Sequence, residues 1–217
     1  MNDLFYRHLP HYHPSNATFF VTFRLAGSLP REVIEQLRQE QEREEQQLTQ
    51  RFRGETLREE RYKLSKKMFG QYDAYLDQGT GPRWLAEPHV AELVTQEIRR
   101  LEPQNYHLIA YCIMSNHGHL AIDQQDIPEP PPLKAGQHYT ALSHAMRLLK
   151  GRTGHYCNQL MERHGPFWED ESYDHVVRDE RELERIVAYI LDNPVRAGLV
   201  QDWREWPFTY VSEDFIP

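Results

Sequence analysis

The chain has 217 residues, of which 39% are hydrophobic, and its formal net charge is -8 at pH 7. This length allows a substantial core, and the acidic balance argues against a protein that coats nucleic acid nonspecifically, although it does not exclude local basic faces. An apolar leader and an apolar run of about 18 residues are both lacking, which argues against a membrane protein and predicts a soluble, cytoplasmic one. The two cysteines indicate neither a disulfide framework nor a zinc ribbon.

The first expected element is a strand over 17–25, a short aromatic and β-branched stretch. Strong helix formers then fill 31–53 and 55–77 and are interrupted at Gly54. Because most positions around both helices are polar, the pattern predicts a projecting helical hairpin, which forms an insertion over residues 31–78. A coiled-coil partner for this hairpin is the alternative interpretation.

The segment after the insertion has the patterns of a helix and two strands. Residues 87–102 carry apolar side chains at helical spacing, which predicts an amphipathic helix packed on a sheet. The next two stretches, 106–114 and 117–123, are typical of a hairpin of two interior strands. We interpret the proline-rich stretch that follows them as a connector.

Three elements complete the chain: a helix over roughly 138–163, a short strand around 173–177 and a helix over 180–193. Asp179 and Glu182 have the spacing of a capping box at the start of the last helix, and Pro194 is expected to end that helix. The full order is therefore strand, helix, strand, strand, helix, strand, helix, with the helical hairpin placed after the first strand.

This order predicts the α+β class, in the form of a ferredoxin-like βαββαβ sandwich with a helical insertion and an added C-terminal helix. In such a sandwich, two helices cover one face of the sheet and leave the other face open. We expect one domain over residues 1–217, with 31–78 as its insertion. A functional site would lie on the open face.

Two histidines occupy the predicted strand 117–123. Side chains alternate along a strand, so His117 and His119 point to one face while Leu120 and Ile122 point to the helix-covered core. The two imidazoles therefore lie on the open face with their Cα atoms about 7 Å apart, where they can share a metal ion. The alternative is a pair of ordinary polar residues on a half-exposed strand.

A second pair of histidines, His11 and His13, has the same spacing near the start of the chain. It lies in a stretch flanked by prolines that looks irregular, so no strand fixes the two rings. We interpret this pair as structural or as a contact of the tail.

The last predicted helix offers side chains of a different chemistry. Tyr189 and Asn193 are four residues apart, so they lie on one side of the helix, at the border of its apolar stripe. A tyrosine and a carboxamide in this position can project into an adjoining site. The alternative is that Tyr189 packs at the rim of the stripe and Asn193 only precedes the proline.

Basic residues gather in the second half of the chain despite its negative net charge. The candidates for contacts with the phosphates of nucleic acid are Arg147, Lys150, Arg152, Arg178 and Arg196. The alternative for each of them is an ordinary solvated helix face. Trp168 and Tyr173 are candidates for stacking on bases, although buried packing suits Trp168 better.

Several segments together resemble a known family. "IMSNHGHLAI", followed about seventy residues later by "YILDNPVRAGLV", resembles the single-tyrosine HUH transposases, and most closely the REP-associated tyrosine transposases. "FFVTFRL", "GPFWEDESYDHVVRDERELERIVAYI" and "DWREWPFTYVS" agree with this resemblance. The similarity covers nearly the whole chain outside 31–78, and the two main motifs occur in the expected order.

The resemblance implies a metal-dependent enzyme that cleaves and rejoins single-stranded DNA beside a hairpin. It assigns Tyr189 as the nucleophile, and His117, His119 and Asn193 as the ligands of Mg²⁺ or Mn²⁺. Tyr189 would form a 5′-phosphotyrosine and release a 3′-hydroxyl, and reverse attack by another 3′-hydroxyl would join strands. A homodimer and a protein partner for the 31–78 hairpin are left open.

Two positions depart from the family pattern. Gly118 stands between the histidines, where a hydrophobic residue is usual, and Ser115 stands where a proline is common. Glycine lowers the stability of a strand, which predicts a looser ligand pair. The alternative function is therefore a catalytically weakened nucleic-acid-binding protein that retains the fold. A metallohydrolase that uses the histidines and Asp123 would need further ligands.

Overall fold

The computed structural model describes residues 4–6, 10–132 and 139–216, without the side chains of residues 4–6, 10 and 11. Two compact units make up the chain. The larger unit combines Met1–Ala26 with Trp84–Pro217, and the smaller unit is Gly27–Arg83. The larger unit holds a mixed α+β layer structure, and the smaller one holds a pair of helices.

A five-stranded antiparallel sheet forms the centre of the larger unit, in the order β6-β3-β5-β4-β7. Its strands are β3 (Thr18–Arg24), β4 (His107–Ile113), β5 (His117–Asp123), β6 (Tyr173–Val176) and β7 (Thr209–Val211). The first four occur where the sequence predicts them. The edge strand β7 was not predicted, because three residues are too few to show an alternating pattern.

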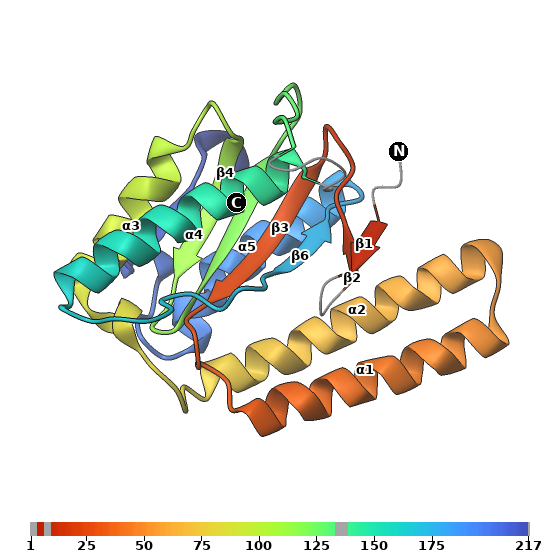
Figure 1. Ribbon diagram of the computed structural model, residues 1–217. Coiled ribbons are helices and arrows are strands. Elements are labelled where there is room, and N and C mark those ends of the chain that lie inside the picture. The colour runs from red at the N-terminus through yellow and green to blue at the C-terminus, as the bar shows by residue number, and fades with distance from the viewer. Residues whose placement is uncertain (1–3, 7–9, 133–138, 217) are drawn as a thin grey trace. The chain divides into compact units, whose positions relative to one another are not determined.

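Helices cover both faces of this sheet (Figure 1). α3 (Pro88–Arg100) and α4 (Ala141–Leu160) pack together on one face, and α5 (Glu180–Arg196) lies against β4, β5 and β7 on the other. The predicted α+β sandwich is thereby confirmed, with α5 as the added helix. The face predicted to be open is the one that carries α5.

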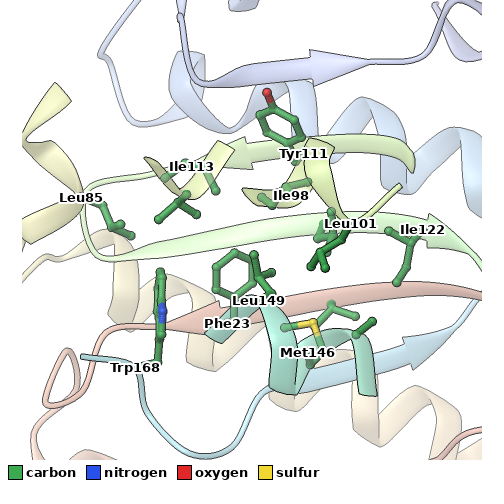
Figure 2. Packing of buried hydrophobic residues seen from close by; sticks show 14 of the residues in the cluster. Phe23, Leu85, Ile98, Leu101, Tyr111, Ile113, Ile122, Met146, Leu149 and Trp168 are labelled. Atoms are coloured by element: carbon green, nitrogen blue, oxygen red, sulfur yellow. The ribbon is translucent and has the colours of Figure 1, made fainter. Parts of the chain in front are cut away.

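The core lies between the sheet and helices α3 and α4, as Figure 2 shows for its central residues. Every second side chain of β3 and β5 points into it, including Phe19, Phe23, Leu120 and Ile122. From α3 and α4 the core receives residues at helical spacing, such as Val94, Ile98, Met146 and Leu149. Because burial of each large apolar side chain contributes about 1.5–3 kcal/mol, this alternation fixes which face of β5 the histidines occupy.

Gly118 has a packing role in this core. Phe23 of β3 is its register partner across the sheet. A Cβ atom at Gly118 would lie 2.7 Å from Cζ of Phe23 and 2.9 Å from Cδ1 of Ile113, distances that are too short for carbon atoms. The absent side chain therefore makes room for the Phe23 ring, which gives the glycine a function that the sequence pattern does not reveal.

The smaller unit is the predicted helical hairpin, formed by α1 (Arg31–Arg51) and α2 (Gly54–Asp77). Leu37, Leu64 and Met68 are the buried members of its own small cluster. Ion pairs link the two helices, for example Lys67 with Glu40 at 3.0 Å. These pairs explain how two largely polar helices stay together with few apolar contacts.

Two expectations about local structure are wrong. α5 does not end at Pro194 but runs through it to Arg196, because a proline in the last turn removes only one hydrogen-bond donor. The stretch around the first histidine pair is not irregular: β1 (Leu4–Tyr6) and β2 (Pro10–Tyr12) form a two-stranded antiparallel sheet. Within the described residues, no helix combines the length and apolar character that crossing a bilayer requires.

Candidate active site

His117 and His119 lie side by side on β5, and their ring Nε2 atoms are 3.1 Å apart. The prediction that they share one sheet face is confirmed, because the two rings meet on the face of β5 opposite to the one that carries Leu120 and Ile122. They are, however, not exposed on that face: 1% of His117 and none of His119 is accessible to solvent. Buried imidazoles whose nitrogens converge in this way are typical of a metal site rather than of a solvated strand.

The other nitrogen of each ring is held by a neighbouring side chain. Nδ1 of His117 lies 2.6 Å from Oδ1 of Asn116, and Nδ1 of His119 lies 2.8 Å from Oγ1 of Thr22. Thr22 is the register partner of His119 on β3. A partner at Nδ1 fixes the orientation of a ring and directs its Nε2 toward a common point, which is how proteins usually orient metal-binding histidines.

α5 is anchored beside the sheet by its first turn. The side chain of Asp179 accepts a hydrogen bond from the backbone N–H of Glu182 at 2.9 Å, which confirms Asp179 as the N-cap and one of the two bonds of the predicted capping box. The buried carboxylate of Glu182 accepts from the backbone N–H of Arg178 at 3.0 Å and lies 3.3 Å from Nε2 of His175 on β6. These contacts tie the start of α5 to the edge of the sheet.

The anchored helix brings Tyr189 next to the histidines. Its ring centroid is 5.3 Å from that of His119, in an edge-on arrangement, and 6.0 Å from that of Phe20. The guanidinium carbon of Arg196 lies 5.2 Å from the centre of the Tyr189 ring. A half-buried phenol thus stands between an imidazole pair and a cation.

Asn193 lies one helical turn beyond Tyr189 and is buried, with 2% of its surface exposed. Within the described part of the chain, its side-chain nitrogen has no hydrogen-bond partner. A buried polar group without a partner is unfavourable by about 1–3 kcal/mol, and an amide can rotate to present its oxygen instead. Asn193 thereby offers a carboxamide oxygen, a ligand type that suits Mg²⁺ and Mn²⁺.

The five predicted phosphate-binding residues do not lie together. Arg178 and Arg196 are exposed at the two ends of α5, whereas Arg147, Lys150 and Arg152 belong to α4 on the opposite face of the sheet. Lys150 donates to the backbone oxygen of Asp170 and to the hydroxyl of Ser172, and Arg152 pairs with Glu97 at 3.2 Å. Arg147 is exposed.

A cavity of about 460 Å³ runs beside α4, and Arg147 and Lys150 line it together with several acidic residues. The acidic lining residues are Glu169, Asp170, Glu171 and Asp174. The charge along this cavity is therefore mixed, and the predicted phosphate contacts of Arg147 and Lys150 stay a prediction. Trp168, also at this cavity, is buried and donates to the hydroxyl of Thr153.

Of the first histidine pair, the structure describes the side chain of His13, and the contacts of this side chain are structural. His13 is buried, its Nδ1 lies 3.0 Å from the hydroxyl of Thr140 and its Nε2 lies 2.9 Å from the carboxylate of Asp174. The side chain of His11 is outside the described residues. His13 thus joins the N-terminal segment to α4 and β6 on the face away from His119.

Sequence reasoning missed Thr22, Asn116 and Phe20 as members of the site. Asn116 is adjacent to a histidine, so its position gave a usable signal. Thr22 and Phe20 face the histidine pair only because β3 pairs with β5 in one register. That register is a long-range property, and no local pattern in "FFVTFRL" reveals it.

The chain resembles known proteins in sequence and in structure. No protein-family model matches the chain. Over 109 residues it is 24% identical to a REP-associated tyrosine transposase of Haemophilus influenzae, a match that covers 50% of this chain and 61% of that relative. The resemblance to REP-associated tyrosine transposases is confirmed. The chain thus matches about three fifths of the length of this transposase.

A solved structure of a REP-associated tyrosine transposase bound to a REP hairpin has the same fold. The TM-score is 0.50 at 17% sequence identity, and the alignment covers 94% of this chain and 80% of the transposase. At this identity the likeness establishes the fold alone. The α+β fold is therefore one that this transposase shares.

Proposed function

We propose that this protein is a metal-dependent, transposase-like enzyme that cleaves and rejoins single-stranded DNA beside hairpins. The observation that carries this proposal is the convergence of two buried Nε2 atoms, 3.1 Å apart, next to the Tyr189 ring. The relative and the structural neighbour are both named as REP-associated tyrosine transposases, and the neighbour is bound to a REP hairpin. These names support the reaction class and the hairpin substrate.

His117, His119 and Asn193 would hold a Mg²⁺ or Mn²⁺ ion, which supplies Lewis-acid polarisation of the scissile phosphate when bound. The protein orients both imidazoles through Thr22 and Asn116 before any ion arrives. The buried side chain of Asn193 brings its carboxamide from α5. Two histidines and an amide leave coordination positions for a substrate oxygen.

Tyr189 is proposed as the nucleophile. Its phenol oxygen would form a bond to phosphorus while the bond between phosphorus and the 3′ oxygen breaks; the phenol proton is lost and the leaving 3′ oxygen gains one. An ordinary phenol, with a pKa near 10, is a poor nucleophile until a cation favours its phenolate. We propose that the guanidinium of Arg196, whose carbon lies 5.2 Å from the centre of the ring, has this role. The product is a 5′-phosphotyrosine, which keeps the energy of the phosphodiester bond for rejoining.

The proposed substrate is a single strand next to a hairpin stem. The cations on the α5 side, Arg178 and Arg196, would contact the strand near Tyr189. We propose that Arg147, Lys150 and Arg152 of α4 contact flanking phosphates, and that the protein acts in the cytoplasm. A homodimer, and a protein partner for the helical hairpin 31–78, are further proposals that this function leaves open.

A fluorescently labelled hairpin DNA with a single-stranded flank, incubated with Mn²⁺, tests the proposal. A denaturing gel should show a covalent protein–DNA adduct, and Tyr189→Phe should abolish this adduct while DNA binding and thermal stability stay close to the parent. The same sequence as a blunt duplex should react little. Hairpin binding without any adduct would instead favour the alternative, a nucleic-acid-binding protein that retains the fold without catalysis.

A further inference from the structure

Phe20 is a buried aromatic residue of β3 on the sheet face that carries the histidine pair, and 3% of it is exposed. Its register partner on β5 is Ala121, whose short side chain leaves room for an aromatic ring beside it. The diagonal neighbour of Phe20 on β5 is His119, and a long aromatic side chain reaches across such a diagonal. The centroids of these two rings are 5.6 Å apart, and their planes differ by only 22°. Phe20 therefore stacks on His119.

The same ring contacts the proposed nucleophile on α5. The centroid of the Tyr189 ring lies 6.0 Å from that of Phe20, and the two planes are 89° apart. Tyr189 also stands edge-on to His119, at 5.3 Å and 69°. Edge-on aromatic pairs are favourable at centroid distances of about 4.5–7 Å. Tyr189 thus stands nearly perpendicular to two stacked rings that come from two different strands.

Phe20 is itself held from the other side of β3. The ring of Tyr173, its diagonal neighbour on the edge strand β6, lies 6.4 Å from the Phe20 ring at 67°. A side chain whose rotamer is locked by its packing can support a neighbouring group with precision. Phe20 therefore gives Tyr189 a fixed surface, which is part of the sheet rather than of α5.

α5 alone does not determine where the phenol oxygen of Tyr189 stands. A helical backbone leaves a tyrosine two common values of the first side-chain torsion, and these two rotamers carry the oxygen to different places. In-line attack requires the reacting atoms to be about 3–3.5 Å apart, so only one rotamer can serve a given phosphate. The contacts of the Tyr189 ring with the sheet decide between the rotamers.

We infer that Phe20 is a positioning residue that holds Tyr189 in the rotamer from which its oxygen attacks. The inference rests on the proposed function, in which Tyr189 is the nucleophile. Phe20 acts through its contact with the Tyr189 ring and takes no part in the bond changes. Loss of the Phe20 ring would open space beside the phenol, and the tyrosine would turn into that space.

Phe20→Leu tests this role when the rate of adduct formation at saturating hairpin DNA is measured separately from the affinity for DNA. The rate should fall roughly 10- to 100-fold, because a misplaced nucleophile rarely reaches the phosphate. The affinities for hairpin DNA and for Mn²⁺ should stay close to those of the parent, since the role of Phe20 concerns the tyrosine. Phe20→Tyr keeps an aromatic ring and should restore most of the rate.

Phe19→Leu is the matched control. Phe19 is the adjacent residue of β3 and is also buried, with 1% exposed, but its ring belongs to the core on the other face of the sheet. This variant should lower the thermal stability about as much as Phe20→Leu does and leave the rate of adduct formation close to that of the parent. Equal losses of rate in the two variants would mean that a loosened β3 slows the reaction, which would overturn the role of Phe20.

The remaining outcomes separate this inference from the proposed function. A Phe20→Leu protein that forms the adduct at the parent's rate would overturn the inference and leave the proposed reaction intact. A fall in Mn²⁺ affinity that matches the fall in rate would also overturn it, because Phe20 would then act on His119. If Phe20→Leu does not fold, Phe20→Met, which is apolar and adaptable but has no ring, takes its place. A parent protein that forms no adduct overturns the proposed reaction, and the role of Phe20 with it.

Discussion

At the scale of single residues, the two histidine pairs have different surroundings. His117→Ala or His119→Ala removes one of the converging nitrogens and should abolish Mn²⁺ binding and adduct formation. His13→Ala breaks buried contacts with Asp174 and Thr140, so it should lower stability by roughly 1–3 kcal/mol and leave metal binding intact. Urea unfolding and Mn²⁺ titration of the three variants measure both effects.

The outcome that contradicts this assignment is specific. A His13 variant that still unfolds cooperatively and yet loses Mn²⁺ binding would move the metal site to the other face of the sheet. If the His117→Ala and His119→Ala variants both still bind Mn²⁺, the converging nitrogens serve only the fold.

Gly118 offers a second prediction at this scale. Gly118→Val introduces the hydrophobic residue that the family usually has, but its Cβ would meet the Phe23 ring at 2.7 Å. We expect a loss of about 1–3 kcal/mol in the free energy of unfolding. Phe23→Leu in the same chain makes room, so the double variant should lose less than the sum of the single variants.

Chemical denaturation of the two single variants and the double variant measures this coupling. A Gly118→Val protein as stable as the parent would mean that the Phe23 ring moves aside without cost. The glycine would then have no packing role, and its departure from the family pattern would be unexplained.

The residue scale also shows how far sequence reasoning reaches. The alternation of side chains along a strand is enough to put His117 and His119 on one face of the sheet, because this alternation depends on β5 alone. The roles of Thr22 and of Gly118 depend on which residue of β3 lies opposite each of them. No local pattern contains that register, so these roles emerge only from the folded sheet.

At the scale of elements, the start of α5 determines where Tyr189 stands. Asp179→Ala removes the cap at the backbone N–H of Glu182 and should cost about 0.5–2 kcal/mol. We also expect slower adduct formation, because a frayed first turn loosens the helix that carries the nucleophile. Asp202→Ala is the control, since Asp202 caps only a short, exposed 3₁₀ turn and should have a smaller effect.

Urea unfolding and the rate of adduct formation, measured on both variants, check this prediction. Equal rates in the Asp179→Ala and parent proteins would mean that the packing of α5 on the sheet, rather than its cap, positions the tyrosine.

Long, periodic elements are predictable and short ones are not. The predicted strand 117–123 coincides with β5, and the predicted helix 87–102 differs from α3 by at most two residues at each end. β7 has only three residues, and it joins the sheet through a partner strand far away in the sequence. β7 forms only through its pairing with β4, and the strand propensities of its three residues do not reveal that pairing.

At the scale of the whole molecule, each compact unit has its own apolar cluster. The buried cluster of the sheet unit takes no member from the described residues 27–83, and the helical hairpin packs around Leu37, Leu64 and Met68. Replacing residues 33–76 with a short Gly/Ser linker should therefore leave a folded, cleavage-competent protein. Circular dichroism should show less helix, with a single cooperative unfolding transition and adduct formation retained.

A shortened protein that aggregates would show that the hairpin is needed to build the fold. A shortened protein that folds and fails to form the adduct would instead place a functional contribution in the hairpin. The order of the elements predicted the α+β sandwich, because each long element carries its own pattern. The expected single domain over residues 1–217, with 31–78 as its insertion, stays a prediction.

The pairing of β3 with β5 also has a kinetic consequence. Thr22 and His119 are 97 residues apart along the chain, and the helical hairpin lies entirely within the loop that their contact closes. Loop-closure entropy grows only logarithmically, so halving this loop would favour closure by only about 0.6 kcal/mol. The insertion therefore adds only a small entropic cost to the pairing of Thr22 with His119. Because 1.4 kcal/mol corresponds to a factor of ten, we expect the shortened chain to refold only about three times faster than the parent.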